Sequence, residues 1–351
     1  MTTEKWEEAT LVEELKRKVL AGETTTRDDA LRLWDAPLEP LADAADEIRE
    51  RFCGDAFDLC AIVNAKSGRC SEDCKFCAQS SRYPTKCEVY PLMSVDAALA
   101  EAKRVAALGV PRFSFVTSGR KLNARELETI CEATRRVRDE TGMTVCGSLG
   151  LLDASEFARL REAGMTRIHN NLETSRRFFP SICTTHSYDE KLAALRAARD
   201  VGMSLCSGGI FGLGETPEDR VDMALTLREL DVESVPINFL NAIPGTPLHN
   251  PTLMPVAGAE ARRIVAVYRF LLPHAAIRLA GGRRLLNDHG VGCFHSGANA
   301  TITGDMLTTA GIEILTDIRM IKARRSSDSS SPWAAGRPDG ACGRLHRGRE
   351  S

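Results

Sequence analysis

The 351-residue sequence has no long hydrophobic run and no excess of either charge. Its apolar stretches fall short of the roughly 18 residues that a membrane-spanning helix needs, and its N-terminus mixes Glu with Lys, unlike a signal peptide. The 46 basic and 48 acidic residues leave a net charge of -2, whereas a dedicated nucleic-acid binder carries a basic excess. We therefore expect a cytoplasmic protein that binds neither membranes nor nucleic acids.

Three common catalytic signatures are also missing. The seven histidines show no zinc-binding helical spacing. The short glycine pattern from Gly212 to Gly214 lacks the lysine of a phosphate-binding loop, and Ser207 does not sit in a nucleophile elbow. These absences argue against a helical zinc protease, a P-loop enzyme and a serine hydrolase.

Cysteine, by contrast, is well represented. There are 12 cysteines in a chain that is 43% apolar, which is enough to bury a core but far too little cysteine for a small disulfide-stapled scaffold. Cytosolic thiols stay reduced, and clustered reduced cysteines usually serve metals or catalysis. The spacing of these cysteines therefore matters more than their number.

The middle of the chain alternates short apolar runs with longer amphipathic stretches. Eight runs have the length and composition of β-strands: residues 59–64, 112–117, 143–147, 166–170, 203–207, 234–239, 276–280 and 298–303. Helical periodicity lies between them, and Ser94, Asn123, Asp153 and Thr216 are N-cap candidates. Eight strand and helix repeats over about 250 residues predict an α/β fold, a (β/α)8 TIM-type barrel, with an open doubly wound sheet as the alternative.

Three regions are predicted. Residues 1–56 should form a helical extension, residues 57–320 the barrel, and residues 321–351, rich in Arg and Ser, a disordered tail. In either α/β fold, reactive groups collect in loops at the carboxyl ends of the strands.

One such loop carries the sharpest motif, Cys70, Cys74 and Cys77 with the spacing C-x3-C-x2-C. Structural zinc usually takes four protein ligands, and ferredoxin-type runs supply four cysteines in other spacings. Three thiolates without a fourth suggest an iron–sulfur cluster with one open iron, although a zinc site is the competing interpretation.

The motif and its context resemble a known family. The segment Cys70–Ser80 is similar to the cluster loop of the radical S-adenosylmethionine (SAM) superfamily. Within it, the chain resembles the biotin synthase family over about residues 10–320, and the similar segments are Asn171–Thr174, Cys206–Gly209, Gly212–Thr216, Ser234–Asn238, Gly297–Asn299 and Leu307–Thr309.

The resemblance implies an enzyme in which Cys70, Cys74 and Cys77 hold a 4Fe-4S cluster that binds SAM. A flavodoxin- or ferredoxin-type donor reduces the cluster, SAM yields a 5′-deoxyadenosyl radical, and this radical abstracts hydrogen from two carbons of dethiobiotin. A second iron–sulfur cluster supplies the inserted sulfur, and the enzyme is expected to be a homodimer.

The resemblance also assigns binding residues. Phe76 matches a position near the adenine of SAM, Asn171 and Glu173 match positions at its ribose, and Lys191 stands where the family commonly has Arg near its carboxylate. For dethiobiotin, the ureido ring is assigned to Asn171 and Asn238, and the carboxylate tail to Thr308 and Thr309.

The second cluster departs from the common family pattern, in which three cysteines and one arginine hold a 2Fe-2S cluster. Cys146, Cys206 and Arg278 match this pattern, but Ser114 replaces the cysteine of the second strand. Because Cys60 and Cys183 are additional cysteines, we expect an atypical subgroup in which Cys60, Cys146 and Cys206 are ligands, with Cys183 and Arg278 as further candidates.

Two rival functions stay open at the level of sequence. One is another radical SAM enzyme, such as a maturase or an amino-acid mutase, although Asn171, Asn238 and the two threonines suit a ureido ring and a carboxylate tail. The other is a non-catalytic iron–sulfur or zinc protein.

Overall fold

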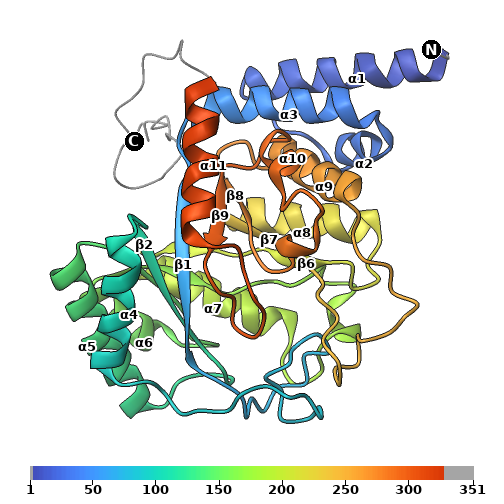
Figure 1. Cartoon of the computed structure of the whole chain (residues 1–351). Coiled ribbons are helices and arrows are strands. Elements are labelled where there is room, and N and C mark those ends of the chain that lie inside the picture. The colour runs from blue at the N-terminus through green and yellow to red at the C-terminus, as the bar shows by residue number, and fades with distance from the viewer. Residues whose placement is uncertain (1–2, 328–351) are drawn as a thin grey trace, which may run out of the picture.

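The computed structural model describes residues 3–327, with side chains for residues 10–323. Three helices precede the sheet: α1 (Thr3–Leu20), α2 (Arg27–Asp35) and α3 (Leu38–Cys53). Helix α3 packs on α1 and on α9 (Gly258–Leu271), and Arg27 and Arg262 make ion pairs of 2.6 and 2.7 Å with Asp222 and Glu39. Figure 1 places these helices at the opposite end of the molecule from the loop that follows β1.

A parallel barrel follows. Its strands are β1 (Asp58–Lys66), β2 (Arg112–Thr117), β3 (Thr144–Ser148), β4 (Met165–His169), β5 (Ser204–Cys206), β7 (Ser234–Phe239), β8 (Ala276–Leu279) and β9 (Ala300–Thr303). The strands pair in chain order, β9 pairs with β1, and the pairing of Cys206 with Ser234 joins β5 to β7. That last pairing closes the ring, which confirms the TIM-type barrel over an open sheet.

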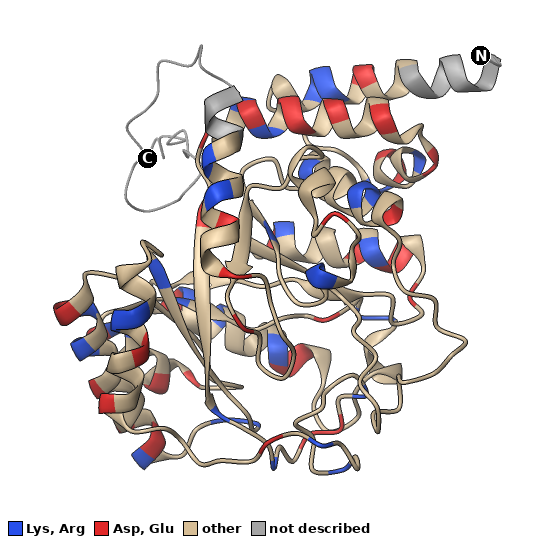
Figure 2. Ribbon diagram, viewed as in Figure 1, with Lys and Arg blue, Asp and Glu red and all other residues tan. Residues whose placement is uncertain are grey.

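Helices cover the outside of the barrel. They are α4 (Val95–Ala107), α5 (Ala124–Thr141), α6 (Ala154–Glu162), α7 (Tyr188–Asp200), α8 (Pro217–Glu229), α9, α10 (Val291–Phe294) and α11 (Ile314–Ser327). The expected N-caps Ser94, Asn123, Asp153 and Thr216 all accept a backbone N–H in the first turn of their helices, which satisfies groups that a helix start leaves unpaired. Acidic and basic residues are interspersed along these helices (Figure 2).

Successive side chains of a β-strand point to opposite faces of the sheet, so every second residue faces the barrel interior. On β2, Arg112, Ser114 and Val116 line a central cavity, while Phe113 and Phe115 are fully buried in the apolar core beneath the helices. The floor of the barrel is therefore polar, and the apolar core lies between the sheet and its helices.

Two features differ from the sequence-based expectation. A short strand, β6 (Gly209–Phe211), pairs with β7 beyond the end of β5. Helix α11 continues through Ser327, so residues 321–327 are helical where a disordered tail was expected, and the remainder of that tail, residues 328–351, lies outside the described residues. No helix in residues 3–327 is long and apolar enough to cross a membrane.

Arg269 links α9 to the far end of the barrel. Its guanidinium is fully buried and donates to the carbonyl oxygens of Gly297, Pro273 and Ala275 and to Asn299 Oδ1, at 2.7–2.9 Å. These acceptors belong to the loops before β8 and β9, so this side chain satisfies backbone groups that water cannot reach.

We predict that Arg269→Met lowers the free energy of unfolding by about 3 kcal/mol, because several buried acceptors lose their donor. Chemical denaturation of the variant measures the loss. Arg135→Met, at an exposed position on α5, is the matched control and should change stability by less than about 0.5 kcal/mol. Equal losses in the two variants would contradict this role of Arg269.

Candidate active site

The loop that follows β1 carries the three clustered cysteines and closes on itself. Cys70 N donates to Gln79 O at 3.0 Å, Ser81 N donates to Cys70 O at 2.8 Å, and Cys77 N donates to Cys74 O at 3.0 Å. The backbone thus gathers the three cysteines in one compact loop at the carboxyl end of the barrel. Burial raises the pKa of Cys77 to about 11, and Cys70 and Glu173 are among its electrostatic neighbours.

A second loop clamps this cysteine loop. Lys75 N donates to Ile182 O at 3.0 Å, and Asp73 Oδ1 accepts from the backbone N–H groups of Thr184 and Thr185 at 2.8 and 3.2 Å. The clamping loop lies between the 3-10 turn η1 (Phe179–Ser181) and α7. Backbone and side-chain groups of the residues between the cysteines therefore hold the loop in place.

One cavity of about 330 Å³ joins most of the residues that the sequence singled out. Its lining includes, from the predicted set, Phe76, Asn171, Glu173, Asn238, Thr308, Thr309, Cys60, Cys146, Cys206 and Arg278. These residues are spread over about 250 positions of the chain, and the barrel brings them to one space.

Glu173 occupies an unusual place in this lining. Its backbone lies in the left-handed region with φ of 70°, its carboxylate is buried, and Oε2 has no hydrogen-bond partner in the described structure. Burial raises the pKa of this carboxyl group above its ordinary value. An unpartnered buried acceptor at the cavity wall suits a ligand that brings hydroxyl donors, as a ribose does.

The neighbouring amides are held by backbone groups. Asn171 Oδ1 accepts from Gly208 N at 3.1 Å, and Asn238 bonds Gly209 O at 3.0 Å and Gly281 N at 2.9 Å. Gly208 is required for this packing, because a Cβ there would lie 2.0 Å from Pro236 O. The Asn171 side chain also hydrogen-bonds the Glu173 carboxyl group, and part of the Asn238 amide stays available to a ligand.

The other predicted binding residues sit nearby. Thr308 and Thr309 lie in the loop after β9, which Asn64 holds by donating to Leu307 O at 3.0 Å. Lys191 is buried behind the cavity wall, where Nζ lies 3.2 Å from Asn170 Oδ1, and it is an electrostatic neighbour of Cys74 and Glu173.

The floor of the cavity holds three thiols from β1, β3 and β5. Cys146 Sγ lies 3.6 Å from Arg112 Nη1, and Cys206 Sγ lies 3.3 Å from His169 Nδ1 and 3.4 Å from Ser234 Oγ. Burial raises the pKa of Cys60 to about 12. Ser114 lines the same cavity next to Cys146 in the strand register.

Positive charge surrounds these thiols. Arg112, Arg167 and Arg278 all contact the carboxylate of Asp58, at 3.3, 3.1 and 2.9 Å. Burial alone would raise the pKa of Asp58, but the guanidinium groups of Arg278, Arg112 and Arg167 hold it well below its ordinary value. Three cations against one anion leave the floor positively charged, which suits thiolates or an anionic cluster.

Arg278 contacts three partners at the floor. Nε donates to Ser234 Oγ and Nη1 to Thr301 O, while Nη2 forms the ion pair with Asp58. The positive charge of Arg278 and the three thiols fit an iron–sulfur cluster at the floor.

The structure also brings in residues that the sequence analysis missed or set aside. Arg112, Arg167 and Asp58 were not singled out, although charged residues at inward positions of β-strands were a readable signal. His169 received no role from the sequence, yet it lines the cavity beside Cys206, and burial lowers its pKa to about 4, which keeps it neutral.

Cys183 lies elsewhere. Proposed from sequence as a further candidate for the second cluster, it sits in the clamping loop with Sγ 3.8 Å from Cys74 Sγ. The described lining of the cavity does not include it. The hydrogen bond between these two sulfur atoms raises the pKa of Cys74 and lowers that of Cys183 to about 4.

Comparison with known proteins agrees with this geometry. Residues 65–227 match the family model of the radical SAM superfamily, and residues 236–325 match that of the biotin and thiamin synthesis associated domain. The fold is similar to methylornithine synthase, with a TM-score of 0.75, 21% identity and coverage of 89% of this chain and 96% of that one. It is also similar to the FeFe-hydrogenase maturase HydG from Carboxydothermus hydrogenoformans, with a TM-score of 0.73, 16% identity and coverage of 92% and 84%.

Full-length relatives are much more similar in sequence. Biotin synthase 2 of Corynebacterium diphtheriae is 57% identical over 89% of this chain and 94% of its own length, and the biotin synthase of Brachyspira hyodysenteriae is 52% identical over 89% and 93%. The chain therefore belongs to the biotin synthase family of radical SAM enzymes.

Proposed function

We propose that this chain converts dethiobiotin to biotin by SAM-dependent sulfur insertion. The observation that carries the proposal is one cavity, whose described lining joins Phe76, Asn171, Glu173 and the residues matched to the substrate with three thiols at the barrel floor. A reaction that moves sulfur onto carbon needs its radical source, substrate and sulfur source within one water-excluding space.

Cys70, Cys74 and Cys77 would hold the 4Fe-4S cluster. When bound, it supplies the electron that cleaves SAM, chemistry that no protein side chain provides. The chain's own residues orient SAM: Phe76 offers a ring to the adenine, Glu173 Oε2 accepts from the ribose, and Lys191 places a positive charge behind the methionyl carboxylate.

The substrate would lie between SAM and the floor. Asn171 and Asn238 present amide groups that can bond a ureido ring, and Thr308 and Thr309 can donate to a carboxylate. Backbone bonds fix the rotamers of both asparagines, so little entropy is lost when the ring binds.

Cys60, Cys146 and Cys206 would hold the second cluster, with Arg278 beside it. Cys60 would replace the second-strand cysteine ligand of the common family pattern, because Ser114 stands at that position here. The surplus positive charge of Arg112, Arg167 and Arg278 offsets the negative charge of thiolate ligands.

The remaining expectations stay predictions. They are a flavodoxin- or ferredoxin-type electron donor, a homodimer, and a cytoplasmic location, where thiols are kept reduced. The decisive assay is conversion of dethiobiotin to biotin by the anaerobically reconstituted chain with SAM and a reductant.

We predict that Cys60→Ala loses the second cluster and keeps SAM cleavage, because the variant removes one of only three thiols at the floor. Iron content, visible absorption and 5′-deoxyadenosine formation test this. Cys131→Ala, which removes a core thiol of α5, should keep the full iron content. Biotin formation and full iron content in Cys60→Ala would exclude Cys60 as a ligand.

Glu173→Gln should weaken SAM binding by tenfold or more, since a hydrogen bond to a charged acceptor contributes about 1.5–3 kcal/mol. Calorimetric titration of the reconstituted variant with SAM measures the change. The exposed Glu162→Gln on α6 serves as its control and should bind SAM as the parent chain does. Unchanged affinity in Glu173→Gln would remove Glu173 from the SAM site.

Asp58→Asn should destabilise the cluster-free chain by about 3–5 kcal/mol, because it leaves three buried guanidinium groups unbalanced. The loss should be smaller once the second cluster is built, since its thiolates restore negative charge. Denaturant unfolding of both forms gives the comparison. Asp189→Asn, in an exposed ion pair with Arg176, should change either form by less than about 1 kcal/mol. Equal destabilisation of the loaded and cluster-free Asp58→Asn chains would argue against a cluster at the floor.

A further inference from the structure

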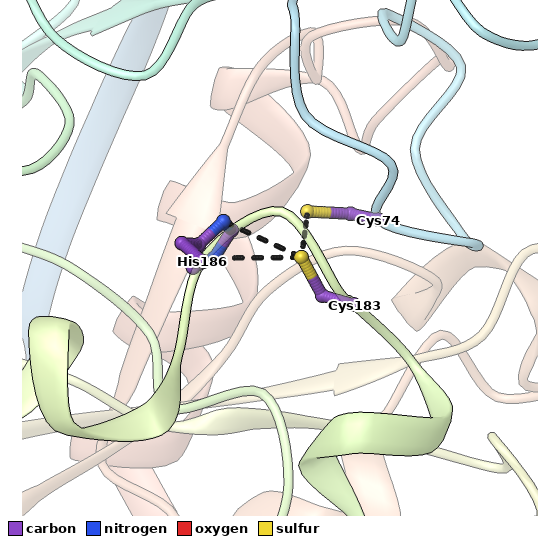
Figure 3. A group of neighbouring side chains, drawn as sticks. All are labelled: Cys74, Cys183 and His186. Atoms are coloured by element: carbon purple, nitrogen blue, oxygen red, sulfur yellow. Dashed lines mark hydrogen bonds between the residues drawn. The ribbon is translucent and has the colours of Figure 1, made fainter.

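Three metal-ligating side chains meet where the clamping loop touches the cysteine loop. Cys74 comes from the loop after β1, while Cys183 and His186 come from the segment before α7 (Figure 3). Cys183 and His186 are buried and Cys74 is partly buried. Two of these three residues have no role in the reaction proposed above.

The separations of Cys183 Sγ from its two partners are close to those of a mononuclear tetrahedral site, and all three ligand atoms lie within 4.8 Å of one another. Bonds of about 2.3 Å to sulfur and about 2.0–2.1 Å to imidazole nitrogen place two sulfur ligands about 3.8 Å apart, and a sulfur and a nitrogen about 3.6 Å apart. Cys74 Sγ and Cys183 Sγ are separated by 3.8 Å, and Cys183 Sγ lies 3.3 and 3.8 Å from Nδ1 and Nε2 of His186.

The surroundings of His186 are those of a metal-ligating histidine. Its Nδ1 lies 2.6 Å from Glu72 Oε2, so Nδ1–H can donate to the carboxylate and leave the Nε2 lone pair for a cation. Glu72 is itself fixed, because Ser71 Oγ and Arg120 Nη1 lie 3.0 and 3.3 Å from its two oxygens. Such a carboxylate orients the ring and strengthens its nitrogen as a ligand.

The loop is held in this shape without a metal. Asp73 Oδ1 accepts from two backbone N–H groups of the clamping loop and lies 3.1 Å from Thr185 Oγ1. The same oxygen lies 3.3 Å from Cys183 Sγ, so the fourth position of an ion bound here falls to this carboxylate or to solvent. A preformed site needs little reorganisation when the ion arrives.

We propose that the cluster-free chain binds one thiophilic divalent cation, of the Zn²⁺ or Fe²⁺ class, through Cys74 Sγ, Cys183 Sγ and His186 Nε2. This site shares Cys74 with the SAM-cluster triad, so the ion and the cluster exclude each other; this consequence rests on the proposed function. The bound ion adds a further link between the two loops before the cluster is built, and it must leave before the enzyme becomes active.

Titration of the reduced, metal-free full chain with Co²⁺, a spectroscopic stand-in for Zn²⁺, tests the site under anaerobic conditions. The parent chain should show the absorption of tetrahedral cobalt with thiolate ligands. Cys183→Ala and His186→Ala should each lose one equivalent of bound metal. Glu72→Gln should weaken binding by about 10–100-fold, the usual effect of removing a carboxylate that orients a histidine ligand.

Matched controls separate this site from the other thiol groups. Cys70→Ala removes a member of the cluster triad alone, Cys60→Ala removes a floor thiol, and Cys87→Ala removes a thiol outside all three groups. All three variants should retain the equivalent that Cys183→Ala and His186→Ala lose. Unchanged stoichiometry and spectrum in both Cys183→Ala and His186→Ala, or loss of that equivalent in Cys70→Ala, would overturn the proposal.

A second measurement distinguishes this proposal from the function itself. After reconstitution, Cys183→Ala should build the SAM cluster and cleave SAM, and preloaded Zn²⁺ should slow reconstitution of the parent chain but not of this variant. Cys74→Ala should lose both the cation and SAM cleavage. If Cys74→Ala still cleaves SAM, the assignment of Cys74 to the SAM cluster is wrong. The cation site is tested separately, by the cobalt titration.

Discussion

Asp58 is the anion on which the barrel floor depends. Its side chain is 4% exposed, and it holds guanidinium groups from β2, β4 and β8, so four strands meet at one carboxylate. Three buried cations would repel one another without it, because the interior screens charge poorly. The network both fixes the geometry of the floor and gives it a net positive charge.

The positive charge of the barrel floor bears on which ligand the cavity can bind. A closed barrel usually fills its interior with apolar layers, whereas here the inward positions of the strands carry thiols, arginines and a neutral histidine. Burying several positive charges costs free energy unless a bound ligand supplies negative charge. The positive charge of the floor suits an anionic ligand, and the unpartnered Oε2 of Glu173 suits a ligand that brings a hydrogen-bond donor.

Much of the fold could be predicted from local sequence signals. The eight strands of the ring, the caps of α4, α5, α6 and α8, and the cysteine loop were predictable because they depend on neighbours in sequence. Strand β6 was not, since Gly209–Phe211 is too short for a periodic pattern and exists because β7 offers it a partner. Arg112 and Arg167 were overlooked for a similar reason: only the closed barrel shows that both face Asp58.

The sequence by itself determined the α/β class, the three-cysteine loop and the family, because strand periodicity, capping residues and motif spacing are local properties. Only the tertiary structure decided which cysteines share a space. It placed Cys60 with Cys146 and Cys206. It placed Cys183 beside Cys74, apart from the cysteines with which the sequence analysis had grouped it. The order of the cysteines in the sequence could not show which of them lie together. The neighbours of a thiol depend on strand register and on loop packing between segments far apart in the chain.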